Sequence, residues 1–161
     1  MSGSMSGDWY NGLDALASSF ARLRDAGLIE LKCFLTKGES RGRHYLADVS
    51  KASPESFFRF SPDGGAEMIK HALDKTKLHL MEADCAFILT DADIVDTPVD
   101  PHAWRRQGID LVGVCTSSDP VETQAKREWM DRHFSRSFIS DSSSMLCRRM
   151  LDYALKQKVK R

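Results

Sequence analysis

Apolar residues recur at three- and four-residue intervals in several stretches of the chain, which is the spacing of one helical face. This periodicity predicts helices over residues 11–26, 68–80, 101–107, 123–133 and 142–155. Asn11 is a candidate N-cap for the first helix, and Gly27 supplies a stop signal after it. Ser142 to Ser144 are candidate caps for the last helix.

Shorter apolar runs between these helices predict strands. Residues 86–89 and 109–115 are continuously apolar and too short for helices, as in strands that are covered on both faces. Residues 28–35 alternate, and a polar turn at 37–42 separates them from a hairpin partner at 44–49. The strand at 137–139 is expected to be the last.

Alternation of strands and helices predicts an α/β fold, a mostly parallel sheet with helices on both faces. In such folds ligands bind beyond the carboxyl ends of the strands, where the strand order reverses. The loops around Ala66 and Asp91 are expected to meet there.

Length and charge narrow the class of protein. A chain of 161 residues with 42% hydrophobic residues fits a single domain, residues 1–161. Lys and Arg number 23, as do Asp and Glu, so no net field favours nucleic acid or an anionic membrane. No apolar run approaches the ~20 residues of a membrane span. We therefore expect a soluble, cytoplasmic protein whose four cysteines are buried thiols.

Four short motifs occur in a characteristic order along the chain. They are Ser2-Gly3-Ser4-Met5, Asp63-Gly64-Gly65-Ala66, a strand ending in Leu89-Thr90-Asp91, and an apolar strand over residues 108–114. In this order the chain resembles the von Willebrand factor A (VWA) domain family. The resemblance implies a Rossmann-like, doubly wound sheet with strand order 3-2-1-4-5-6.

The resemblance also implies a site like the metal-ion-dependent adhesion site of that family, which binds Mg²⁺. It assigns Ser2 and Ser4 as hydroxyl ligands, Asp91 as a carboxylate acting directly or through water, and Asp93 as the reserve carboxylate. The second loop of the site would be Gly64, Gly65 and Ala66. The family's leading Asp is absent and Ala66 stands in place of its Thr, so we expect Mg²⁺ binding to be weak or absent in the isolated chain. Outside the resemblance, Asp96 and Asp100 are interpreted as solvated or capping residues.

The family's central first strand has no counterpart in this sequence. Its absence would leave two rows of backbone groups without partners, each group costing about 1–3 kcal/mol if buried, in a domain stabilised by only about 5–15 kcal/mol. Three explanations stay open: the flanking strands pair directly, another polypeptide donates a strand, or Met1 is an internal start of a longer or split product.

The function expected from the resemblance is a non-catalytic protein–protein interaction module in a larger assembly. Its partner would be another protein chain, which donates a strand or an acidic metal ligand. One alternative is an accessory subunit of an AAA-type ATPase of the chelatase or remodelling type. The other is a hydrolase, since serines at 140 and 142–144 and several histidines are present, although no Gly-x-Ser-x-Gly motif connects them.

Overall fold

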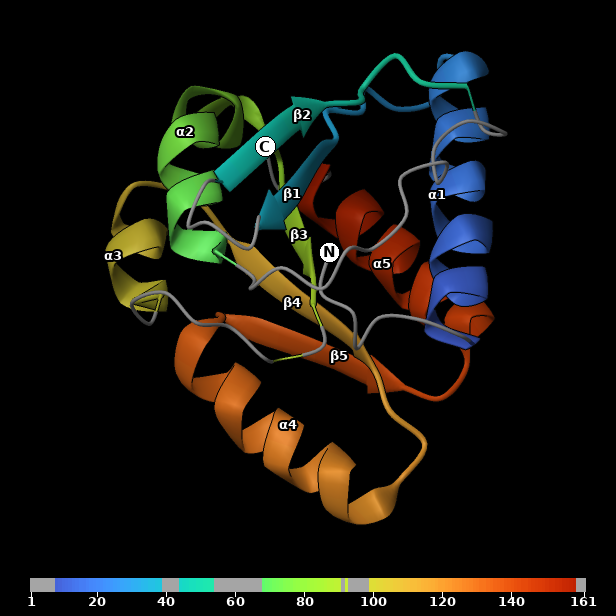
Figure 1. Ribbon diagram of the computed structural model, residues 1–161. Coiled ribbons are helices and arrows are strands. Elements are labelled where there is room, and N and C mark those ends of the chain that lie inside the picture. Colours follow the sequence, from blue (N-terminus) through green and yellow to red (C-terminus); the bar gives the residue numbers. More distant parts are fainter. Residues whose placement is uncertain (1–7, 39–43, 54–67, 91, 93–98, 159–161) are drawn as a thin grey trace. The chain divides into compact units, whose positions relative to one another are not determined.

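The computed structural model describes residues 8–38, 44–53, 68–90, 92 and 99–158. The chain divides into two compact units, residues 1–68 and 69–161, and each is described by itself. The first contains α1 (Asp8–Asp25), β1 (Phe34–Gly38) and β2 (His44–Asp48). The strands β1 and β2 form the predicted antiparallel hairpin, with Phe34 opposite Asp48 and Gly38 opposite His44 (Figure 1).

Two predicted boundaries in this unit are wrong. The helix begins at Asp8, so Asn11 lies inside its first turns and is not the N-cap. The strand begins at Phe34 rather than at residue 28. The cause is the end of α1: Gly27 has φ +70°, and the amide of Leu28 donates to the carbonyl of Leu23 at 3.0 Å. This Schellman-type cap takes Leu28 into the helix terminus, where its side chain is 63% exposed.

A small core joins α1 to the segment after β2. Ala17, Ala21 and Val49 are buried together, with Cys33 and Leu35 packed against them. The guanidinium of Arg24 donates to the carbonyl of Ala52 at 3.0 Å, and the amide of Cys33 donates to the hydroxyl of Ser50 at 2.9 Å. Burial raises the pKa of the Cys33 thiol to about 12. All four cysteines are free thiols.

The second unit contains a three-stranded parallel sheet in the order β3-β4-β5. The strands are β3 (Ala86–Leu89), β4 (Leu111–Thr116) and β5 (Arg136–Ser140). The helices are α2 (Ile69–Glu82), α3 (Pro101–Arg106), α4 (Pro120–His133) and α5 (Ser143–Lys158). In the register of this sheet, Phe87 of β3 lies beside Val112 of β4, and Val114 of β4 lies beside Phe138 of β5. Residues that are neighbours in this way point to the same face of the sheet.

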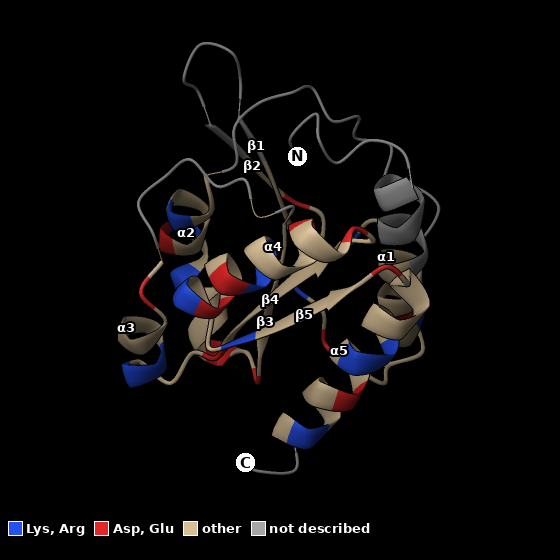
Figure 2. Cartoon of the chain, turned by 90° about the horizontal axis from the view of Figure 1, so that it is seen from below, with Lys and Arg blue, Asp and Glu red and all other residues tan. Residues whose placement is uncertain are grey.

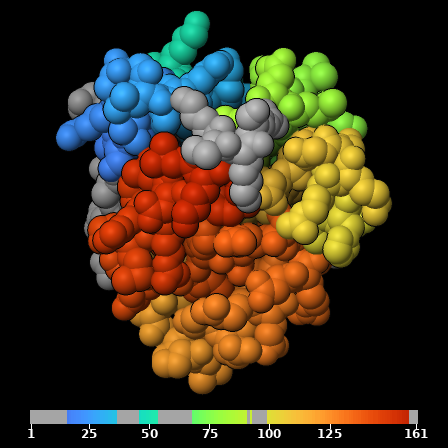
Figure 3. Space-filling model, turned by 180° about the vertical axis from the view of Figure 1, so that it is seen from behind, coloured from blue at the N-terminus to red at the C-terminus, as the bar shows by residue number. Residues whose placement is uncertain are grey.

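Helices cover both faces of this sheet, as predicted. On one face the ring of Tyr153 from α5 makes edge contacts with Phe87 and Phe138, at centroid distances of 6.3 and 5.9 Å. Figure 3 shows α5 in red on the surface viewed from behind. On the other face Leu111 and Cys115 of β4 share a buried cluster with residues of α2, α3 and α4, which include Leu73, Trp104 and Met130. The described part of this unit is therefore a three-layer α/β arrangement.

Other element boundaries also differ from those expected. The strand β4 starts at Leu111 because the amide of Ile109, a residue only 2% exposed, donates to the carbonyl of Trp104 in α3 at 3.1 Å. The helix α4 starts at Pro120 rather than at 123, with Asp119 as its N-cap. Leu155 lies on the predicted apolar stripe of α5 but is 60% exposed. The prediction that Asp100 caps a helix is confirmed, since its carboxylate accepts from the amide of His102.

The overall class is mixed α/β with a parallel sheet flanked by helices, which confirms the coarse prediction. Among the residues that the structure describes, β1–β2 form one sheet and β3–β4–β5 form another. No helix in the described ranges is long and apolar enough to cross a membrane.

Candidate functional site

The residues to which the resemblance assigned a metal site all lie outside the part of the chain that the structure describes. They are Ser2, Ser4, Gly64, Gly65, Ala66, Asp91 and Asp93. Their assignment stays a prediction, and the candidate site described below consists of residues at the carboxyl ends of the parallel strands.

The carboxyl ends of the three parallel strands carry hydroxyl groups at one edge. The amide of Thr90 donates to the carbonyl of Val114 at 3.0 Å, and the amide of Ser117 donates to the carbonyl of Ser140 at 3.2 Å. These bonds continue the two ladders by one residue, so Thr90 comes level with Cys115, two residues before Ser117, and Ser117 directly follows the partner of Ser140. We call this row the carboxyl edge.

The three hydroxyls have different environments. Thr90 is completely buried, and its Oγ1 accepts from the amide of Ala92 at 3.0 Å, in a turn where Ala92 has φ +69°. The Oγ of Ser117 is buried without a hydrogen bond to the described residues. The Oγ of Ser140 accepts from the amide of Ser142 at 3.1 Å and donates to Asp141 at 3.4 Å. Ser117 is thus the hydroxyl whose hydrogen-bonding capacity is unused.

Two helices begin at the carboxyl edge, and local side chains cap both. One oxygen of Asp119 accepts from the amides of Val121 and Glu122 at 2.8 and 2.9 Å. The Oγ of Ser142 accepts from the amide of Met145 at 3.3 Å, as the predicted cap of α5. The sequence reasoning missed Asp119, although the Asp-Pro pair at 119–120 is a recognised helix-start signal.

Exposed apolar side chains flank this edge. Val121, in the first turn of α4, is 80% exposed, and Met145, in the first turn of α5, is 47% exposed. The sulfur of Met145 lies 3.6 Å from the hydroxyl of Ser140. A binding partner can therefore contact these apolar side chains and the exposed carboxylates of Asp119 and Asp141, whereas Thr90 and the Oγ of Ser117 are buried.

Hard cations require several oxygen ligands around one point. Among the described residues, no three His, Cys, Asp or Glu side chains are grouped so that they could hold one ion. The carboxylate of Asp119 is already used as a helix cap. These groups alone do not fit a Mg²⁺ site, and no chemistry is derived through a metal.

A polar network occupies the opposite, amino end of the sheet. The carboxylate of Asp110, just before β4, accepts hydrogen bonds from the hydroxyls of Ser135 and Tyr153. Arg105 lies 3.7 Å from the same carboxylate, and the guanidinium of Arg136 lies 5.1 Å from the centroid of the Tyr153 ring. Sequence reasoning missed this network, because no local pattern pairs Asp110 with a residue of the last helix.

The network shifts the titration of its own members. Burial raises the pKa of Asp110, but the hydrogen bonds from Ser135 and Tyr153 and the charges of Arg105 and Arg136 together outweigh burial, so the pKa lies below its ordinary value. Burial, followed by the hydrogen bond to Asp110, raises the pKa of Tyr153 to about 12. A tyrosine that is harder to ionise is no better as a base or nucleophile at neutral pH, so we interpret the network as a structural clamp.

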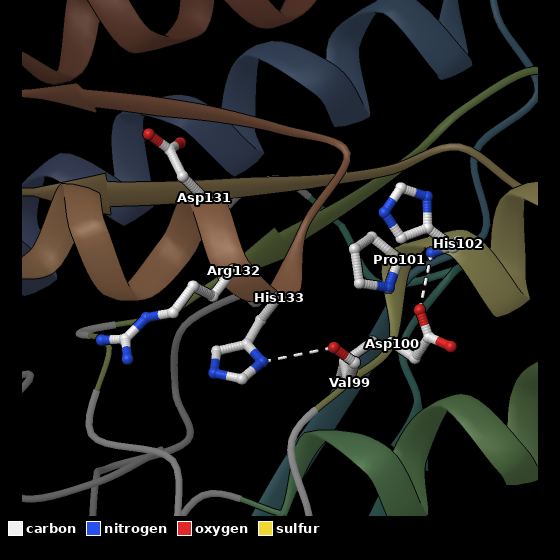
Figure 4. A pocket seen from close by; sticks show the side chains of 7 residues that line it. All are labelled: Val99, Asp100, Pro101, His102, Asp131, Arg132 and His133. Carbon is white, nitrogen blue, oxygen red and sulfur yellow. Dashed lines mark hydrogen bonds between the residues drawn. The ribbon is translucent and has the colours of Figure 1, made fainter.

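A hollow of about 430 Å³ lies between the start of α3 and the end of α4. Its lining is Val99, Asp100, Pro101, His102, Asp131, Arg132 and His133. The Nδ1 of His133 lies 3.2 Å from the carbonyl oxygen of Val99, and Figure 4 shows the side chains of Asp131, Arg132 and His102 pointing in different directions. A catalytic or metal site needs convergent groups, so the hollow is a weaker candidate than the carboxyl edge.

Comparison with known protein families finds no family model that matches this chain, and no curated protein matches it either.

Proposed function

We propose that this protein is a non-catalytic protein–protein interaction module of the VWA-like kind, which uses the carboxyl edge of its parallel sheet to contact another chain in a larger assembly. The observation that carries the proposal is that three parallel strands end at the same end of one sheet, where the first turns of α4 and α5 leave Val121 and Met145 exposed. Surfaces that combine apolar contact with directed hydrogen bonds are suited to protein recognition.

The hydrogen bonds at this edge favour binding over hydrolysis. A serine nucleophile requires a general base within about 2.6–3.2 Å. Within the described ranges, the hydroxyls of Ser140 and Ser142 bond to amides, a carboxylate and another hydroxyl. The imidazole of His133 is instead directed at Val99. A serine–histidine pair is therefore not the arrangement that these contacts support.

The strand order gives further support. Parallel strands in the sequence β3-β4-β5 have the order that the resemblance predicts for strands four to six, and the antiparallel β1–β2 hairpin agrees with its strands two and three. In that arrangement a partner strand would join β3, whose sequence, Ala-Phe-Ile-Leu, contains no charge or proline that would discourage pairing.

Site-specific photo-crosslinking tests the proposal. A photoreactive amino acid is introduced at Ser118, which is exposed at the carboxyl edge, and separately at Gln107, which is exposed after α3 near the amino end of β4. In the cells that make the protein, we expect a discrete adduct from position 118 and none from position 107. Native mass spectrometry of the purified complex, with Mg²⁺ and after chelation, then gives partner, stoichiometry and metal content.

The outcomes of these experiments distinguish a protein-interaction module from the alternatives. Equal adducts from both positions would indicate non-specific capture. A monomer by light scattering, with no adduct from either position, would contradict the proposal. If the purified chain stimulated an ATPase, the accessory-subunit alternative would replace the proposed function.

A further inference from the structure

We propose that α2 carries an interaction surface for a second copy of this chain, and that two α2 helices pack antiparallel through Leu78 and Met81. This surface consists of other residues than the carboxyl edge. The inference therefore goes beyond the proposed function and does not depend on it.

The helix α2 presents apolar residues on two faces. Ile69 and Leu73 are buried in the core of the second unit. Leu78 and Met81 lie one turn apart on a second face and are 76% and 52% exposed. Figure 3 shows α2 in green on the surface viewed from behind. A helix that packs against a single core has a polar outer face, so the second apolar stripe indicates that a further partner covers it.

The charges beside this stripe are complementary to themselves in the antiparallel arrangement. In the heptad notation for paired helices, Leu78 and Met81 occupy positions a and d, and Lys75 and Glu82 occupy successive e positions. A two-fold axis across an antiparallel pair keeps each flank of the seam on its own side, so e positions face e positions. Lys75 of each copy then meets Glu82 of the other, and symmetry forms this pair twice. Figure 2 shows the basic and acidic segments of α2 in blue and red.

Neither of these two charges is matched inside its own helix. The positions three and four residues from Lys75 carry no carboxylate, and those before Glu82 carry no Lys or Arg. Asp74, on the same stripe as Leu78, is by contrast paired with Lys70, with 3.3 Å between Nζ and Oδ2. A parallel copy would bring Lys70 toward Lys75 of the other helix, which is a like-charge contact. Charge therefore favours an antiparallel second copy.

The contact is small, and this sets the strength of the dimer. The helix has 14 residues, and two of its large apolar side chains are exposed. Interfaces at the low end of the size range bind weakly, so we expect a monomer in dilute solution and a dimer at high protein concentration. Sedimentation velocity of the full chain over a wide range of concentrations measures this equilibrium.

Charge reversal and exchange test the pairing of Lys75 with Glu82. Lys75→Glu should weaken the dimer about tenfold, because two exposed ion pairs become like-charge contacts. The double variant Lys75→Glu with Glu82→Lys presents the same pair in reverse, so it should recover the wild-type affinity. A general disturbance of the helix would not be repaired by the second substitution.

Apolar variants test the seam itself. Leu78→Ser should abolish the dimer, whereas Leu155→Ser, which changes a side chain on α5 that is 60% exposed, should leave its affinity unchanged. Both side chains are exposed, so neither substitution removes core packing. Near-identical amide spectra of the dilute proteins will confirm that each variant is folded.

Three results would overturn the inference: a monomer at every concentration, a dimer that survives Leu78→Ser, or a charge exchange that fails to recover the affinity lost in Lys75→Glu. None of these results affects the crosslinking from Ser118, which tests the carboxyl edge. The two proposals can therefore fail separately.

Discussion

The hydroxyl of Tyr153 in α5 donates a hydrogen bond to the carboxylate of Asp110, which lies 43 residues earlier and directly before β4. The same ring contacts Phe87 of β3 and Phe138 of β5. This one side chain therefore connects the last helix to β3, to β5 and to the residue that precedes β4. The contact fixes α5 on its face of the sheet at the end opposite to the carboxyl edge.

Tyr153→Phe should lower the free energy of unfolding by about 1–3 kcal/mol, because it leaves a partly buried carboxylate oxygen without a donor while keeping the ring contacts. Urea unfolding measures the change. In an Asp110→Asn background the same substitution should have a smaller effect, since the charged acceptor is gone. Equal losses in the two backgrounds would show that the hydroxyl acts through some other contact.

Stability should also depend on pH through Asp110. Its pKa is lowered in the folded protein, so the carboxylate contributes stability that is fully present above its unfolded pKa of about 3.9. This contribution is lost as the pH falls through the lower, folded value. The stability difference between the wild-type protein and Asp110→Asn should be constant from neutral pH down to about 5 and should shrink below about 4. A difference that shrinks already between pH 7 and 6 would point to another titrating group.

Tyrosine ionisation gives a complementary measurement at high pH. The pKa of Tyr153 is raised to about 12. Its protonated form therefore stabilises the fold below about pH 10, and that contribution is lost between about pH 10 and 12. Absorbance titration should reveal one late-ionising tyrosine that is absent from the spectrum of Tyr153→Phe.

The sequence predicted the interior of this fold better than its boundaries. Strand β3 was predicted with its observed bounds, because a four-residue apolar run is too short for a helix and is followed by polar residues. Residues 28–33 were wrongly assigned to a strand, because alternation alone does not reveal that Leu28 completes a helix cap. Caps depend on backbone geometry at single residues, and a periodic pattern carries little information about them.

The site was less predictable than the fold. The rule that ligands bind at the carboxyl ends of parallel strands selects the end of the sheet that we propose as the site, and this stays a prediction, but it did not indicate Ser117 or Ser140 as residues that meet there. Their proximity comes from the register between β4 and β5, which pairs Thr116 with Ser140. Register is a tertiary property, so the spacing of 23 residues between Ser117 and Ser140 gives no local sign of it.

Gly113 should be the least replaceable residue of β4. A Cβ at this position would lie against the ring of Phe134 and the terminal methyl of Met130, both of which are buried. Alanine should stabilise the backbone by about 0.5–1 kcal/mol relative to glycine, but overpacking should destabilise by about 1–3 kcal/mol, so the net effect is a loss. Thermal unfolding measures it, and Phe134→Leu in the same chain should recover part of the loss. A more stable Gly113→Ala variant would contradict this packing.

Mg²⁺ should have little effect on the isolated chain. Ala66 lacks the hydroxyl that the resemblance would require, and the described residues do not group three acidic or imidazole ligands around one point. Chelation should therefore leave the thermal midpoint unchanged, whereas a tightly bound ion would raise it in proportion to the logarithm of its concentration. A midpoint that rises steadily with Mg²⁺ but not with Na⁺ of equal ionic strength would show that a metal site exists after all.

The two exposed aspartates at the carboxyl edge should behave differently when truncated. Asp119→Ala removes the acceptor for the amides of Val121 and Glu122, so the free energy of unfolding should fall by about 0.5–2 kcal/mol, as for other N-caps. Asp141→Ala removes no cap and should change stability by less than about 0.5 kcal/mol. Urea unfolding of both variants, compared with Asp119→Asn, which keeps a capping oxygen, checks the assignment. If Asp141→Ala were the more destabilising change, Asp141 rather than Asp119 would be the structural aspartate of this edge.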